Sequence, residues 1–144
     1  MIPKDRSNIE TELQNDSSRN LHQKNIKECL DLISNEDQRV FTAIQAAKPN
    51  IHSFLERAVP LFEKGGRVFY MGAGTSGRLG VLDASEIPPT FQMPVGRFIG
   101  IIAGGDSALR KSSEGKEDEK EGGKVALLEN KITENDILIG IAAG

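Results

Sequence analysis

A short apolar run that leads directly into a glycine-rich loop constrains the fold of this chain most strongly. Residues 67–71 are β-prone, and the loop Gly72-Ala-Gly-Thr-Ser-Gly77 follows at once, with a helical apolar pattern that begins inside it. Two further apolar runs cover residues 98–103 and 137–141. Strands that are apolar throughout and alternate with helices indicate a parallel sheet that is buried on both faces. The sequence therefore predicts the α/β fold class.

The chain before this loop has a different character. Residues 21–64 contain no glycine, and their apolar residues recur at helical spacing. This pattern predicts three helices, with breaks at residues 34–37 and at Pro49-Asn50. The polar residues before Leu21 are expected to form an extended arm. The predicted domain organisation is an arm with helices over residues 1–64 and an α/β domain over residues 65–144.

The second part of the chain contains two further predicted helices. Pro88-Pro89 is expected to close the helix that begins in the glycine loop, and another helix is predicted over residues 124–130. Three strands alone leave one edge and one face of a sheet poorly covered. The region is therefore expected to be the first half of a larger α/β domain.

Composition excludes several classes of protein. The 144 residues carry a net charge of −3 with 38% apolar and 27% charged residues, which is typical of a soluble globular protein. No basic stripe points to a nucleic-acid partner, and no apolar run is long enough for a membrane. The single cysteine, Cys29, has no metal-ligand neighbours and is expected to be a small buried residue. A cytoplasmic protein without a metal is expected.

The glycine loop is the clearest candidate site. Between a strand and a helix, unpaired backbone N–H groups and the positive end of the helix dipole attract an anion, and glycine lets the backbone approach it closely. The residues expected to bind a phosphate are Gly74, Thr75, Ser76, Gly77 and Arg78. A tight turn capped by Ser76 without a ligand is the structural alternative.

Two nucleotide-binding interpretations compete with this one. The loop matches the dinucleotide pattern G-x-G-x-x-G, but that pattern requires an acidic residue about 20 positions further on, after the second strand. Arg97 stands there, and Asp106 comes late. A nicotinamide-dependent oxidoreductase is therefore disfavoured. A Walker loop is excluded, because no lysine follows the glycines.

The stretch from Gly72 to Glu86, followed by Pro88-Pro-Thr-Phe91, resembles the signature of the N-acetylmuramic acid 6-phosphate etherases. The resemblance extends over nearly the whole chain from Thr11. Its further motifs are Thr11-Glu12 with Asn15, residues 33–37, residues 100–105, Glu114-Gly115 with Glu117-Asp118, and residues 135–143.

This resemblance implies a sugar isomerase (SIS) domain, a three-layer sandwich around a parallel sheet, here its first half, preceded by the helical segment. Such domains bind phosphosugars without a cofactor, usually as homodimers. The implied reaction cleaves the D-lactyl ether of N-acetylmuramic acid 6-phosphate to N-acetylglucosamine 6-phosphate and D-lactate, in cell-wall recycling. The implied catalytic residues are Glu86, as proton donor, and Glu114, as second acid.

Both carboxylates also have plainer interpretations. Glu86 fits the exposed end of a helix, and Glu114 belongs to a charged run of the kind that covers a solvated surface. Glu117 is the alternative match within that run. Two acids suit the chemistry, because one must be ionised to remove the C2 proton while the other is protonated to release the lactyl oxygen.

The chain departs from the family pattern at two positions. Gly144 stands where a serine of a second phosphate loop is expected, and Ile87 stands where many relatives have cysteine. A truncated and inactive product is therefore one alternative. A phosphosugar-binding regulator without catalysis, of the glucokinase regulatory protein type, is another. The presence of both Glu86 and Glu114 favours the enzyme, since a sensor needs no acid–base pair.

Overall fold

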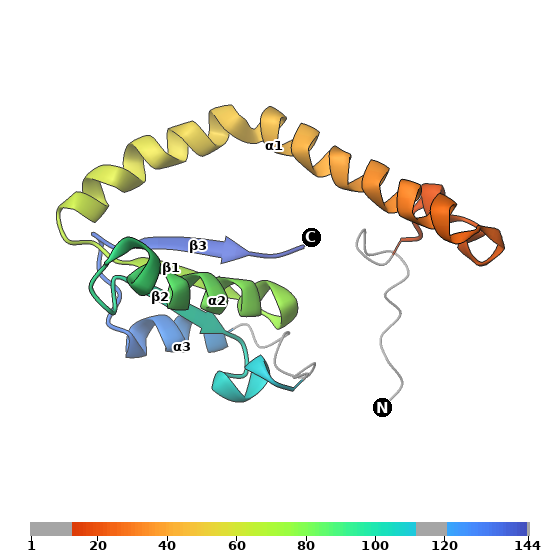
Figure 1. Ribbon diagram of the computed structural model, residues 1–144. Helices are drawn as coiled ribbons and strands as arrows, with labels where there is room; N and C mark the ends of the chain where they lie inside the picture. The colour runs from red at the N-terminus through yellow and green to blue at the C-terminus, as the bar shows by residue number, and fades with distance from the viewer. Residues whose placement is uncertain (1–12, 112–120, 144) are drawn as a thin grey trace. The chain divides into compact units, whose positions relative to one another are not determined.

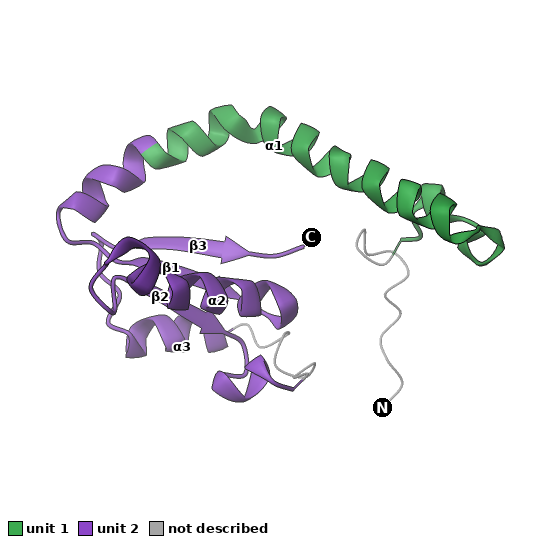
Figure 2. Ribbon diagram, in the orientation of Figure 1, with its two compact units in different colours: residues 1–55, 144 green, residues 56–143 purple. Residues whose placement is uncertain are grey.

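The computed structural model describes residues 13–111 and 121–143. The chain divides into two compact units, residues 1–55 with residue 144, and residues 56–143 (Figure 2). The helix α1 (Ile26–Glu63) runs from the first unit into the second. The domain boundary expected after residue 64 stays a prediction, because compactness alone does not define a domain.

The described start of the first unit is not the extended arm that was expected. It contains two 3-10 turns, η2 (Asp16–Ser18) and η3 (Leu21–Gln23). The Asn15 side chain accepts a hydrogen bond from the Ser17 amide at 2.8 Å and donates one to Glu36 of α1 at 2.9 Å. The segment is therefore tied to the side of α1.

One helix replaces the three that were predicted between residues 21 and 64. The polar residues at 34–37 do not interrupt α1, because most of them are exposed and solvated side chains suit a helix surface. Pro49 also lies inside α1, where it removes only one backbone hydrogen bond. Cys29 is half-buried rather than fully buried.

The second unit is built on a parallel sheet of three strands, β1 (Val68–Gly72), β2 (Phe98–Ile102) and β3 (Ile137–Ile141), in the order β2-β1-β3 (Figure 1). Each strand lies within one residue of its predicted run. The two ladders pair Val68 with Phe98 and with Ile137. The carboxyl ends of all three strands therefore meet at one edge of the sheet.

Helices cover both faces of this sheet, which confirms the predicted α/β class and its three layers. The helix α2 (Gly74–Phe91) packs on the face that carries Tyr70 and Gly100. The helix α3 (Gly122–Glu129) approaches Met71 on the other face through Gly123. Phe69 in β1 is fully buried and lies at the centre of the core.

The end of α2 differs from the prediction. Pro88 and Pro89 lie inside the helix, which continues to Phe91, so they do not close it where expected. Phe91, the last residue of α2, is 64% exposed although it is a large apolar residue. Phe62 is half-buried and packs against Phe98 at a centroid distance of 5.6 Å, while Phe54 is half-buried. No helix within the described ranges is long and apolar enough to span a membrane.

A pair of strand glycines tests how closely α2 approaches the sheet. A Cβ atom at Gly100 would lie 2.6 Å from the Val81 Cα atom, whereas one at Gly140 would meet nothing within 4 Å. We expect Gly100→Ala to lower the free energy of unfolding by about 1–3 kcal/mol, because it overpacks this contact. Gly140→Ala is the matched control and should be nearly neutral. Urea denaturation followed by circular dichroism measures both, and equal effects would contradict the prediction.

Candidate functional site

The glycine loop lies at the carboxyl edge of the sheet, where β1 turns into α2. Ala73 precedes the helix, and its carbonyl accepts the first intrahelical bond from Gly77 at 3.0 Å. No side chain caps this end of α2, so the amides of Gly74, Thr75 and Ser76 have no helical partner. Together with the helix dipole, three amides that converge at a helix start suit a bound anion.

Glycine is required at several points of this loop. Gly74 has a φ of +52°, a conformation that favours glycine. A Cβ atom on Gly77 would lie 2.6 Å from the Gly72 oxygen and 2.7 Å from Ile102 Cγ1. The loop is also held to β2, because the Ala103 amide donates to the Gly72 oxygen at 3.0 Å. The glycine pattern therefore serves close packing as well as ligand approach.

The side chains of the loop differ in access. Thr75 is exposed and Ser76 is half-buried. Both residues belong to the first turn of α2, which also carries the three amides. The Arg78 guanidinium donates to the carbonyls of Leu109 at 3.3 Å and Lys111 at 3.2 Å. Arg78 thus anchors the segment after η4 (Asp106–Leu109), and its role as a phosphate ligand stays a prediction.

Glu86 is not brought to the loop within one chain. It lies twelve residues beyond Gly74, which is about 18 Å along the helix axis. Ala84 is buried against the sheet, and two further residues turn the helix by about 200°, so the exposed Glu86 lies on the opposite side. Glu114 and its alternative Glu117 lie outside the described residues.

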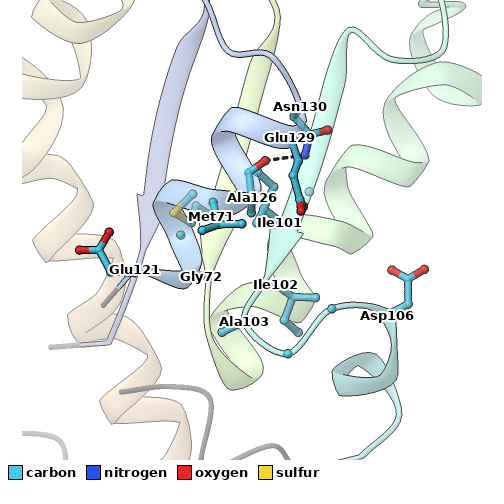
Figure 3. Close-up of a pocket in the computed structure, with 16 residues that line it drawn as sticks. Met71, Gly72, Ile101, Ile102, Ala103, Asp106, Glu121, Ala126, Glu129 and Asn130 are labelled. Atoms are coloured by element: carbon cyan, nitrogen blue, oxygen red, sulfur yellow. Dashed lines mark hydrogen bonds between the residues drawn. The ribbon is translucent and has the colours of Figure 1, made fainter. Parts of the chain in front are cut away.

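A cavity of about 810 Å³ adjoins the loop at the carboxyl ends of β1 and β2, bounded on the other side by α3 (Figure 3). Gly72, Ala103 and Gly105 contribute backbone to its wall. Asp106 of η4 lines it on one side, and Glu121 and Glu129, at the two ends of α3, line it on the other. Apolar side chains such as Met71 and Val125 also line it, so the cavity combines apolar walls with a few carboxylates, as small-molecule sites commonly do.

The sequence analysis did not identify the loop after β2 as part of this cavity. The available signal was the Gly104-Gly105 pair directly after β2, and in the structure both glycines have positive φ values. Two strands that are parallel neighbours place their loops side by side at one edge. Asp106 was weighed only as a nucleotide ligand, whereas the structure puts it on the rim of the cavity beside this loop.

A half-buried tyrosine was also missed. Burial, together with the nearby carboxylate of Asp83, raises the pKa of Tyr70 of β1 to about 12. The Tyr70 hydroxyl is therefore protonated throughout the neutral range and lies on the sheet face that α2 covers.

These features define a parallel α/β domain with a glycine loop at its carboxyl edge. The comparisons make the class specific: residues 50–144 match the family model of the glucokinase regulatory protein N-terminal SIS domain. The chain belongs to this family of SIS domains.

Relatives of known name are similar over most of the chain. An N-acetylmuramic acid 6-phosphate etherase from Lactococcus lactis is 49% identical over 139 residues, 96% of this chain and 47% of the relative. Etherases from Bacteroides fragilis and Porphyromonas gingivalis are each 54% identical over 123 residues, 85% of this chain. The chain spans about half the length of these relatives. The resemblance seen in the sequence is confirmed.

Proposed function

We propose that the protein is an N-acetylmuramic acid 6-phosphate etherase, as its relatives are named, and that the bond it cleaves is the D-lactyl ether. The observation that carries this proposal is the similarity of about 50% to these etherases over nearly the whole chain. The uncapped glycine loop supports it, because the substrate carries a phosphate and the first turn of α2 offers unpaired amides.

The proposed reaction needs a base and an acid. In the open-chain sugar, the base removes the C2 proton next to the aldehyde, a C2–C3 double bond forms, and the C3–O bond breaks. The acid protonates the lactyl oxygen, which leaves as D-lactate. Water then adds its oxygen to C3 and a proton returns to C2, which gives N-acetylglucosamine 6-phosphate. We assign these two roles to Glu86 and Glu114.

The position of Glu86 adds a condition to this assignment. A hexose phosphate bound at the start of α2 does not extend about 18 Å along the same helix. We therefore propose a homodimer in which Glu86 of the partner subunit reaches the sugar held at the glycine loop. Arg78 has a positioning role in this proposal, because it holds residues 109 and 111, which lead toward Glu114.

Release of D-lactate from N-acetylmuramic acid 6-phosphate tests the proposal. Turnover in water enriched in ¹⁸O should place the label on the sugar product and not on lactate, because the C3–O bond breaks. The unphosphorylated sugar is the control and should react much more slowly. Absence of lactate release by the folded protein, or label in lactate, would overturn the proposed reaction.

A second candidate function is a phosphosugar-binding regulator without catalysis. The family model named for the glucokinase regulatory protein favours it. Such a protein should bind the sugar phosphate, as measured by calorimetry, and leave it unchanged over long incubation.

A negative charge placed at Ser76 tests phosphate binding by the glycine loop without a loss of stability. We expect Ser76→Asp to weaken binding of the sugar phosphate at least tenfold, because its carboxylate occupies the anion position and repels the phosphate. The same carboxylate suits the first turn of a helix, so the melting temperature should not fall. Ser76→Asn has the same size without the charge and is the matched control. Equal binding by both variants, measured by calorimetry, would remove the phosphate from this loop.

A further inference from the structure

The two faces of the sheet in the second unit are covered in different ways. On one face, α2 has the buried residues Gly77, Gly80 and Ala84 and lies directly on the strands. On the other face, every residue of α3 is exposed or half-buried, and Val125 and Leu128 are 50% and 64% exposed. The cavity of about 810 Å³ lies between α3 and the carboxyl halves of β1 and β2 (Figure 3). The helix α3 therefore stands away from the strands that it covers.

The carboxyl end of α3 is fixed to the amino edge of the sheet. The Arg67 guanidinium donates to the Asn130 carbonyl at 3.1 Å and to the Lys131 carbonyl at 2.8 Å. The same guanidinium donates at 2.7 Å to Asp136, whose carboxylate is almost fully buried. Arg67 precedes β1 and Asp136 precedes β3, so these bonds tie the end of α3 to two strands at once.

The amino end of α3 lies near the carboxyl ends of β1 and β2 and is held more weakly. It begins with two glycines, which favour a helix less than alanine does, and no side chain among the described residues caps it. It approaches the sheet at Gly123, where a Cβ atom would lie 3.1 Å from the Met71 sulfur. The unbranched methionine side chain adapts to more than one position of its neighbour. The ion pair of Glu121 with Lys124, at 3.8 Å, is exposed and adds little.

We propose that α3 is a flap, hinged at its carboxyl end, whose amino end closes over a sugar phosphate bound at the glycine loop. The hinge lies at residues 130–131, where Lys131 has a φ of +52° and the helix ends. The free end is the one beside the cavity that adjoins the glycine loop, so closure changes the site without breaking the bonds of Arg67. The identity of the ligand rests on the function proposed above, whereas the hinge does not.

Closure exchanges water for apolar contact. Met71, Ile101 and Val125 line the cavity. Protein cores retain few voids larger than one water molecule, so a cavity of about 810 Å³ holds water against these side chains while α3 is open. Inward movement of the free end expels this water. Glu121 at the free end and Asp106 on the opposite wall then accept hydrogen bonds from the sugar hydroxyl groups, and this contact makes the ligand favour the closed position.

Distances between spin labels test the hinge. With Cys29 replaced by serine, one nitroxide is placed at the exposed Ser85 of α2 and the second at Lys124 in the free half of α3. Glu134, which is exposed and lies beyond the hinge, gives the control pair with Ser85. Labelled chains are diluted with unlabelled ones, so that pulsed electron paramagnetic resonance reports pairs within one chain. We expect a broad distance distribution for Lys124 and a narrow one for Glu134 in the ligand-free protein.

Addition of the reaction product tests closure. Saturating N-acetylglucosamine 6-phosphate should narrow and shift the distribution for Lys124 and leave that for Glu134 unchanged. A ligand-free distribution for Lys124 as narrow as that for Glu134 would overturn the hinge, and a broad one that bound ligand does not narrow would overturn closure. If calorimetry shows that no sugar phosphate binds, the proposed function fails, and the ligand-free comparison still decides the hinge.

A wedge in the cavity tests whether binding needs closure. Ala126 of α3 is half-buried and lines the cavity, so Ala126→Leu fills space that closure requires. We expect it to raise the dissociation constant of N-acetylglucosamine 6-phosphate about tenfold or more. Lys124 lies about 200° around the helix from Ala126 and is exposed, so Lys124→Leu is the matched control and should change the constant by less than about twofold. Circular dichroism should show the same helix content for both variants, and equal dissociation constants would overturn closure.

Discussion

Replacing Glu86 by glutamine is expected to reduce D-lactate release by about 10²–10⁴-fold, the usual contribution of a general acid or base. Glutamine has nearly the same shape but neither accepts nor supplies a proton at neutral pH. Glu86 is exposed, so its replacement should not disturb the packing of α2. The binding constant for the sugar phosphate should change little, because the phosphate contacts lie at the other end of the helix. Retained turnover would remove Glu86 from the mechanism.

Mixing two inactive variants tests whether Glu86 acts across a dimer. Ser76→Asp disables the loop of one chain, and Glu86→Gln disables the acid of the other. If Glu86 of the partner subunit serves each loop, mixed dimers have one intact site, and equal mixing should restore about a quarter of the activity. If each site uses its own Glu86, the mixture stays inactive. A further control is a mixture of Glu86→Gln with itself, which should remain inactive.

The strands and the loop were predictable because their signals are local. A buried parallel strand requires a continuous apolar run, and all three runs fall within one residue of β1, β2 and β3. The glycines of the loop reflect packing that only glycine permits, such as the approach of Gly77 to Ile102. Both signals are direct consequences of steric exclusion and burial.

The helical region was misjudged because polar residues and prolines were given too much weight. Pro49 removes one hydrogen bond, but α1 retains the bonds of the turns on either side. Apolar residues of α1 continue at spacings of four and three on both sides of the two expected breaks, and this long-range regularity was the stronger signal. Pro88 and Pro89 show the same error near the end of α2.

The candidate site was only partly predictable, because residues of one sequence motif do not all lie at the glycine loop in the structure. Arg78 follows the loop directly, but its guanidinium turns to the carbonyls of Leu109 and Lys111. Glu86 belongs to the same motif but lies three turns away on another side of α2. A resemblance assigns roles to residues, whereas helix geometry decides which of them meet.

The substitution with the largest expected effect on stability is at Asp136, which links the amino ends of β1 and β3. Asp136 precedes β3, and its side chain is 2% exposed. It accepts hydrogen bonds from the Arg67 amide at 2.8 Å and guanidinium at 2.7 Å, and from the Thr133 amide at 2.8 Å. We expect Asp136→Asn to lower the free energy of unfolding by about 3–5 kcal/mol, because it leaves the Arg67 charge without its buried partner. Urea denaturation measures the loss.

An exposed ion pair provides the matched control for this substitution. Lys27 and Asp31 lie one turn apart in α1 at 2.6 Å, with side chains that are 84% and 59% exposed. Asp31→Asn makes the same chemical change where water screens both charges, so its effect should stay below about 1 kcal/mol. Losses of equal size in the two variants would show that the bond between Arg67 and Asp136 contributes no more than a surface pair.

The carboxylate of Asp136 should make the free energy of unfolding depend on pH in the acidic range. The hydrogen bonds from Arg67, followed by those from Thr133, hold the pKa of Asp136 far below its usual range. A depressed pKa in the folded state stabilises the fold fully above the pKa of the unfolded chain, near 3.9, and this contribution is lost as pH falls below it. The difference in the free energy of unfolding between the parent chain and Asp136→Asn should therefore be constant near neutral pH and shrink below about pH 4. Because the carboxyl edge of the sheet is remote from this bond, Asp136→Asn should leave the sugar-phosphate binding constant of the folded molecules unchanged. A constant difference down to pH 2 would mean that the carboxylate charge is not what stabilises this end of the sheet.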